Sequence, residues 1–161
     1  MKRGLAAIGF LMLMTSSAFA QDEHHGQGYV FFAPGVTSGG GSGFAHFGGG
    51  GEALFKQVGA GAELGYLTPW REFRDGLGLF SANGSYHVTA GGDGKVVPFA
   101  TGGYSLLFRG GSKSGFNFGG GVNYWMGDKT GVRFEVRDNT FSEFEFDRAH
   151  FISFRIGFSF R

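Results

Sequence analysis

The chain has 161 residues, enough for one domain, and its 14 basic and 13 acidic residues give a formal net charge of +1. This balance leaves no basic excess for nucleic acid, and the lack of cysteine excludes disulfides and thiolate metal sites. The 33 glycines disfavour helices, because each interior glycine costs about 1 kcal/mol relative to alanine. An aromatic fraction of 17% is too high for a disordered chain. The composition therefore favours a β-rich fold.

The N-terminus has the pattern of an export signal. A basic start precedes an apolar run from Leu5 to Met14, which has the length of a signal-peptide core. The run is too short to serve comfortably as an anchor helix across about 30 Å of bilayer. Ala18 and Ala20 supply the small residues of a cleavage site. We predict that residues 1–20 are removed after Ala20, leaving a single domain over residues 21–161.

After a predicted flexible tail over residues 21–27, apolar residues alternate with polar or small ones through most of the chain. A period of two is the signature of strands with one apolar face. The first and fifth strands do not alternate cleanly, so we expect a β-bulge where the apolar face switches. Eight strands are predicted, at about 28–37, 44–55, 57–70, 76–89, 96–109, 116–126, 132–137 and 150–161.

The connections between these strands alternate in length. The turns at 56–57, 90–95 and 127–129 are short, whereas the intervening connections are longer on average. Short turns on one side and longer loops on the other are typical of bacterial outer-membrane barrels. In lipid every backbone polar group must be paired, so a sheet there has to close on itself. An eight-stranded barrel is narrow enough for side chains to fill its interior.

The chain resembles the small eight-stranded outer-membrane barrels, the group that contains the OmpA transmembrane domain, OmpX and the opacity-type adhesins. The resemblance rests on the export signal, the strand count and the last strand, although this chain ends on Arg161 where the family usually ends on an aromatic residue. It implies an all-β fold, an eight-stranded antiparallel transmembrane β-barrel of up-and-down topology in the outer membrane. It also implies an assembly signal read by the barrel assembly machinery, carried by Phe154, Ile156, Phe158 and Phe160.

The strand alternation directs charged side chains into the lumen. A charge in a narrow, poorly hydrated lumen needs a partner. We therefore predict a salt-bridge network that plugs the barrel, with a proton or ion path, or a pair of catalytic carboxylates, as the alternative. The predicted network comprises Glu52, Glu63, Arg133, Glu135, Arg137 and Arg155.

A lipid-A-modifying enzyme would require a hydroxyl nucleophile with a histidine base and a carboxylate nearby. Ser85 and His87 share a face of one strand, whereas His150 and Ser153 lie on opposite faces. The glycine runs do not complete a phosphate-binding motif. We therefore predict no catalytic residue, no cofactor and no metal site.

A candidate surface loop lies between the last two strands, in a connection predicted over residues 138–149. The first interpretation is that the strands simply run on past the membrane there; the second is that the loop binds a partner protein or, through divalent cations, lipopolysaccharide phosphates. Its acidic and aromatic residues are Asp138, Phe141, Glu143, Phe144, Glu145, Phe146 and Asp147.

The predicted function is a non-catalytic outer-membrane barrel without a sizeable pore, in an envelope-structural or surface-interaction role. The expected partners are outer-membrane lipid, lipopolysaccharide, the barrel assembly machinery and a surface protein, and nucleic acid is not among them. The alternatives are a soluble periplasmic barrel of lipocalin type, a narrow porin and a lipid-A-modifying enzyme. The lysines at 56, 95, 113 and 129 fall in turns, whereas a soluble exterior would scatter them along the strands.

Overall fold

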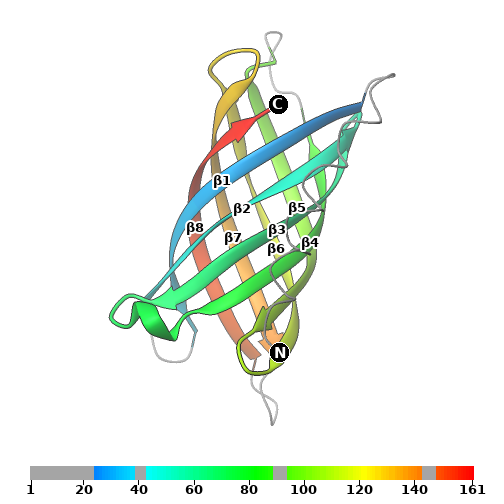
Figure 1. The fold of residues 1–161 in the computed structure, drawn as a ribbon. Helices are drawn as coiled ribbons and strands as arrows, with labels where there is room; N and C mark the ends of the chain where they lie inside the picture. The colour runs from blue at the N-terminus through cyan, green and yellow to red at the C-terminus, as the bar shows by residue number, and fades with distance from the viewer. Residues whose placement is uncertain (1–23, 39–42, 89–93, 143–147) are drawn as a thin grey trace, which may run out of the picture.

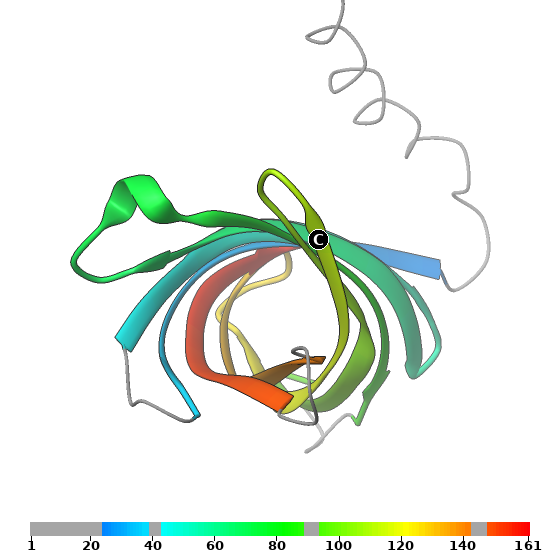
Figure 2. The same cartoon turned by 90° about the horizontal axis from the view of Figure 1, so that it is seen from below.

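The computed structural model describes residues 24–38, 43–88, 94–142 and 148–161, which form a closed barrel of eight antiparallel strands (Figures 1 and 2). Each strand pairs with its neighbours in the chain, and the last pairs with the first. The strands are β1 (His24–Thr37), β2 (Gly43–Phe55), β3 (Val58–Pro69), β4 (Leu77–His87), β5 (Val96–Phe108), β6 (Ser112–Trp125), β7 (Thr130–Ser142) and β8 (Arg148–Phe160). The predicted fold class is confirmed. We call the end that holds the β2–β3 and β6–β7 turns and Arg161 the terminal end, and the other the loop end.

Two details of the first and fifth strands differ from the sequence-based prediction. β1 begins at His24 and pairs with β2 from there, so residues 24–27 belong to the barrel and not to a tail. The predicted β-bulge is absent, because β5 pairs with both of its neighbours in unbroken register. Alternation looked irregular because Phe99 and Leu107 point into the lumen while their neighbours point outward.

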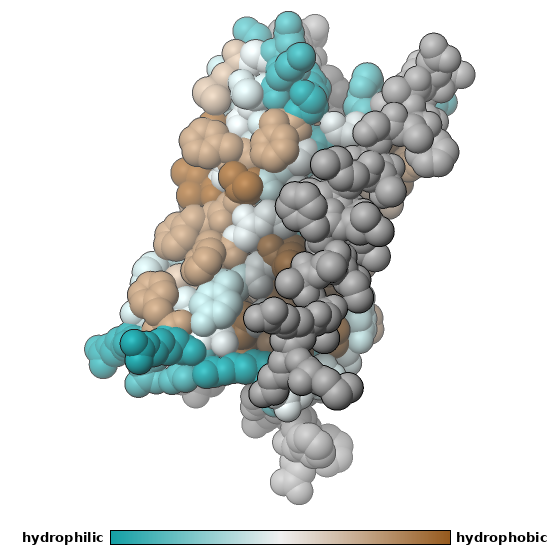
Figure 3. Space-filling view, in the orientation of Figure 1, coloured by the Kyte–Doolittle hydropathy of each residue, from teal (hydrophilic) through white to brown (hydrophobic). Residues whose placement is uncertain are grey.

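The outer wall of the barrel is apolar. Figure 3 shows brown, hydrophobic side chains over the part of the wall that is visible in this view, with hydrophilic residues gathered at its two ends. β8 contributes alternate outward side chains, among them Phe154, Ile156 and Phe158. Among the described residues, no helix has the length and hydropathy to cross a membrane.

The lumen is apolar near its ends and charged in the middle. At the loop end the core comprises Phe44, Leu67, Leu79, Leu107 and Phe141. At the terminal end Phe99 and Trp125 are buried, and the Arg161 guanidinium lies 4.2 Å from the centre of the Trp125 ring. The charged residues between these apolar layers are therefore screened from water on both sides.

Candidate functional site in the lumen

Glu63 lies at the centre of the charged layer. β3 directs its side chain inward, where it is only 3% exposed. Arg155 of β8 donates to both carboxylate oxygens, at 3.1 and 2.9 Å, in the bidentate geometry that suits a guanidinium. Arg137 Nη1 lies 2.9 Å from Oε1, and the Tyr29 hydroxyl donates to Oε2 at 3.0 Å. One buried carboxylate thus faces two guanidinium groups.

Glu135 joins this pair to the rest of the network. It lies between Arg133 and Arg137 on β7, and residues two apart in a strand share a face. Arg137 Nε donates to Oε1 of Glu135 at 2.5 Å, and Arg133 Nε donates to Oε2 at 3.1 Å. All three side chains are buried. One strand therefore supplies the middle of a continuous row of alternating charges.

Glu52 is the last residue of the row on the side of the terminal end. Its Oε1 atom lies 3.4 Å from Arg133 Nη1 and also accepts a hydrogen bond from Gln27. Its Oε2 atom accepts from Ser85 at 2.5 Å and lies 3.3 Å from His87 Nε2. The structure therefore brings together all six residues that the sequence assigned to the lumen network. Their order is Glu52, Arg133, Glu135, Arg137, Glu63 and Arg155, and their formal charges cancel.

Aromatic rings cover the guanidinium groups of this row. The Arg133 guanidinium lies 3.8 Å from the centre of the Phe99 ring and 4.6 Å from that of Tyr29, and Arg155 lies 4.2 Å from that of Phe31. A cation over an aromatic face is stabilised by the ring quadrupole, and more so when water is excluded. Sequence reasoning missed these rings because they lie on the two strands with large apolar residues on both faces.

Ser85, His87 and Glu52 form the nearest approach to a hydrolytic site. His87 Nε2 lies 3.1 Å from Ser85 Oγ and 3.3 Å from Glu52 Oε2. In a serine triad the imidazole uses one nitrogen for the hydroxyl and the other for the acid. Here a single nitrogen faces both groups, and Ser85 donates directly to Glu52. The arrangement satisfies a buried carboxylate and does not activate a nucleophile.

The other histidine–serine pair is not brought together. Ser153 is buried in the lumen and donates to the Arg137 carbonyl at 3.4 Å. His150 lies on the outer wall, where its Nδ1 atom is 2.7 Å from Asp138 Oδ2. Among the described residues, no three His, Cys, Asp or Glu side chains are grouped to hold a metal ion.

In the part of the candidate surface loop that the structure describes, the two strands run on, as the first of the two interpretations expected. β7 continues to Ser142 and β8 starts at Arg148, so the connection is shorter than the predicted 138–149. Asp138 lies within β7, and Phe141 is buried in the lumen core at the loop end instead of standing in a loop. The other five residues lie outside the described part of the chain: Glu143, Phe144, Glu145, Phe146 and Asp147.

The remaining predicted site residues lie on the outer wall. The side chains of Phe154, Ile156, Phe158 and Phe160 are all exposed on β8. The β3–β4 connection protrudes sideways from the barrel (Figure 2) and carries Asp75, whose Oδ1 atom accepts a hydrogen bond at 3.0 Å from Nη2 of Arg109 in the β5–β6 connection. This hydrogen bond lowers the pKa of the Asp75 carboxyl below its usual value.

The fold, the apolar wall and the charged interior define the class of small eight-stranded transmembrane barrels. Neisserial surface protein A superposes with a TM-score of 0.67 at 13% identity, covering 85% of this chain and 96% of that one. The N-terminal barrel domain of Pseudomonas aeruginosa OprF superposes with a TM-score of 0.56 at 15% identity, covering 84% and 100%. A de novo designed transmembrane β-barrel gives a TM-score of 0.54 at 12% identity, covering 83% and 93%. At these identities the likeness shows the fold.

No protein-family model matches the sequence, and no relative is found among curated proteins.

Proposed function

We propose that this protein is an outer-membrane barrel that serves the envelope as a structural or surface-interaction element, without catalysis and without a sizeable pore. The observation that carries the proposal is the combination of an apolar outer wall with a buried, charge-balanced interior. A barrel in lipid requires this inside-out distribution. A soluble lipocalin-like barrel would instead line its cavity with apolar residues and expose its charges.

The proposal includes export and assembly. Cleavage after Ala20 would release the domain into the periplasm, and the exposed aromatic face of β8 would be read by the barrel assembly machinery. Because the barrel has an even number of strands, the N- and C-termini of the chain would both lie on the periplasmic side. The loop end would then face outward, where a surface protein or lipopolysaccharide could bind.

Cell fractionation tests the location. We expect the protein in the outer-membrane fraction, extracted only with detergent, and migrating faster on a gel when unheated than when boiled. The shift is expected because a closed barrel with all its strands paired stays compact until heat opens it. Release with the periplasmic proteins, together with one mobility at both temperatures, would show that the proposal is wrong.

Liposome swelling tests the closed lumen. We expect liposomes that contain the barrel to swell in small sugars no faster than empty ones, because the row of ion pairs and the apolar layers on both sides fill the interior. A general porin in the same liposomes is the positive control. Swelling at a rate comparable to that porin would contradict a plugged lumen and favour the narrow-porin alternative.

A further inference from the structure

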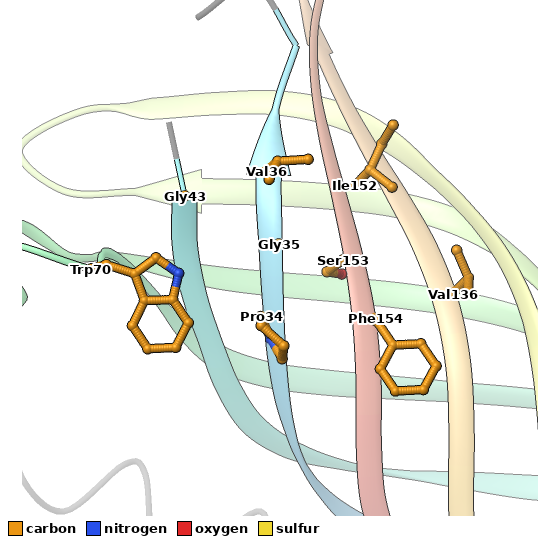
Figure 4. A pocket seen from close by; sticks show the side chains of 9 residues that line it. All are labelled: Pro34, Gly35, Val36, Gly43, Trp70, Val136, Ile152, Ser153 and Phe154. Atoms are coloured by element: carbon orange, nitrogen blue, oxygen red, sulfur yellow. The ribbon is translucent and has the colours of Figure 1, made fainter. Parts of the chain in front are cut away.

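A groove runs down the outer wall at the seam between the first and last strands, near the loop end (Figure 4). It has a volume of about 480 Å³. Its walls come from β1, β7 and β8 on one side and from the Trp70 ring on the other. The residues that line it are mostly apolar: Pro34, Gly35, Val36, Gly43, Trp70, Val136, Ile152, Ser153 and Phe154.

The sequence creates this groove through one proline and one outward-facing glycine. Pro34 has no backbone N–H, and the pairing of β1 with β8 is interrupted at Ala33 and Pro34 before it resumes at Gly35. Gly43 places no side chain in the floor, whereas a side chain at Gly35 would point into the lumen, toward the Phe44 ring. A Cβ atom at Gly43 would lie 2.7 Å from Trp70 Cδ1, so glycine is needed there for the indole to pack as it does.

Polar groups border the groove on its loop side. Asp138 and His150 are the next outward positions after Val136 and Ile152 on their strands, and Thr140 Oγ1 lies 3.2 Å from His150 Nδ1. The backbone N–H of His150 donates to Ser38 Oγ at 3.0 Å. Across the groove, Trp70 is followed by the β3–β4 connection, whose exposed charged residues are Arg71, Glu72, Arg74 and Asp75. Asp75 is paired with Arg109, at 3.0 Å. The apolar groove thus opens onto a polar border that carries guanidinium groups on the Trp70 side.

We propose that the groove holds an acyl chain of lipid A, the phosphorylated, multiply acylated glycolipid of the outer leaflet. This inference rests on the proposed function, because the groove faces lipid only if the barrel spans the outer membrane. In that orientation the loop end lies in the outer leaflet, at the depth of the glycolipid headgroup. Arg71 contacts the phosphate, for which a guanidinium fork is well suited, and His150 with Thr140 contacts the sugar hydroxyl and amide groups.

A pair of matched substitutions on β8 tests the groove. Ile152 lines it, whereas Ile156, which is also outward and equally exposed (46% and 44%), does not. Full-length barrel is purified in mild detergent, and bound lipid A is counted by native mass spectrometry. We expect Ile152→Trp to lower lipid A binding about tenfold by filling the groove, and Ile156→Trp to leave it unchanged. Equal binding by both variants would overturn the proposal.

The headgroup contact has its own test. We expect Arg71→Gln to weaken binding of lipid A but not of its dephosphorylated form, while Lys129→Gln at the terminal end changes neither. Phosphatidylglycerol bound as tightly as lipid A would overturn the choice of a glycolipid. Every variant is first checked for the heat-dependent mobility shift. If the barrel folds in membranes but these substitutions do not change its lipid binding, this inference alone is refuted. If the chain never enters membranes, the proposed function is refuted.

Discussion

Replacing Glu63 by alanine is expected to lower the free energy of unfolding by about 3–5 kcal/mol, the usual loss when one partner of a buried ion pair is removed. The variant removes the carboxylate that lies between Arg155 and Arg137, so Arg155 loses its bidentate partner and Arg137 keeps only Glu135. Urea unfolding of the barrel in lipid bilayers measures the change. Trp125 is a suitable fluorescent reporter because its indole is buried in the lumen.

Asp128→Ala is the matched control, since it also removes a carboxylate but from the exposed β6–β7 turn. We expect its unfolding midpoint to stay within about 0.5 kcal/mol of the unmodified chain. If the two variants unfold at the same urea concentration, the buried row of charges does not stabilise the barrel as its geometry indicates.

The second large effect is expected at a lumen glycine. An added Cβ at Gly121 would lie 2.7 Å from Glu135 Cα and would also collide with the Phe134 carbonyl oxygen, both on the paired strand β7. Backbone cannot move aside as a side chain can, so Gly121→Ala is expected to cost about 3 kcal/mol or more. We expect a greatly reduced yield of barrel with the heat-dependent mobility shift.

Gly51→Ala provides the comparison on the outer wall. A Cβ there meets only the Gln27 carbonyl oxygen, at 3.5 Å, which is ordinary contact. We expect this variant to assemble at the normal yield. Normal assembly of the Gly121 variant as well would mean that β6 and β7 do not approach each other as closely as the structure has them.

Much of the fold follows from the sequence because the side-chain period of a strand is two. Alternation alone placed Glu63 and Arg137 inside and Phe154 outside. It failed for β1, where Tyr29 and Phe31 point inward between outward apolar neighbours, so both faces are apolar and the period disappears. The same ambiguity at Phe99 led to the expectation of a bulge.

The pairing within the site could not be predicted. The choice of Arg155 and Arg137 for Glu63, and of Arg133 for Glu52, depends on the stagger of the strands around the barrel. That stagger is set by the whole closed sheet and has no local sequence signal. Tyr29 was missed for a related reason, since a polar tip on an inward side chain gains its role only when the opposite strand is in place. Gln27 was missed because the sequence assigned residues 21–27 to a tail, whereas β1 begins at His24.

The charged row also shapes the order in which the barrel can form. Glu63 and Arg155 are separated by 92 residues in the chain, and Glu52 and Arg133 by 81. A β2–β3 hairpin that folds alone therefore carries two unmatched carboxylates on the face that will become the lumen, and a β7–β8 hairpin carries an excess of guanidinium groups. The ion pairs between these strands form only when β8 pairs with β1 and the barrel closes. The electrostatic stabilisation is therefore gained mainly in the final closure. This arrangement disfavours partly formed sheets, so we expect the barrel to assemble cooperatively.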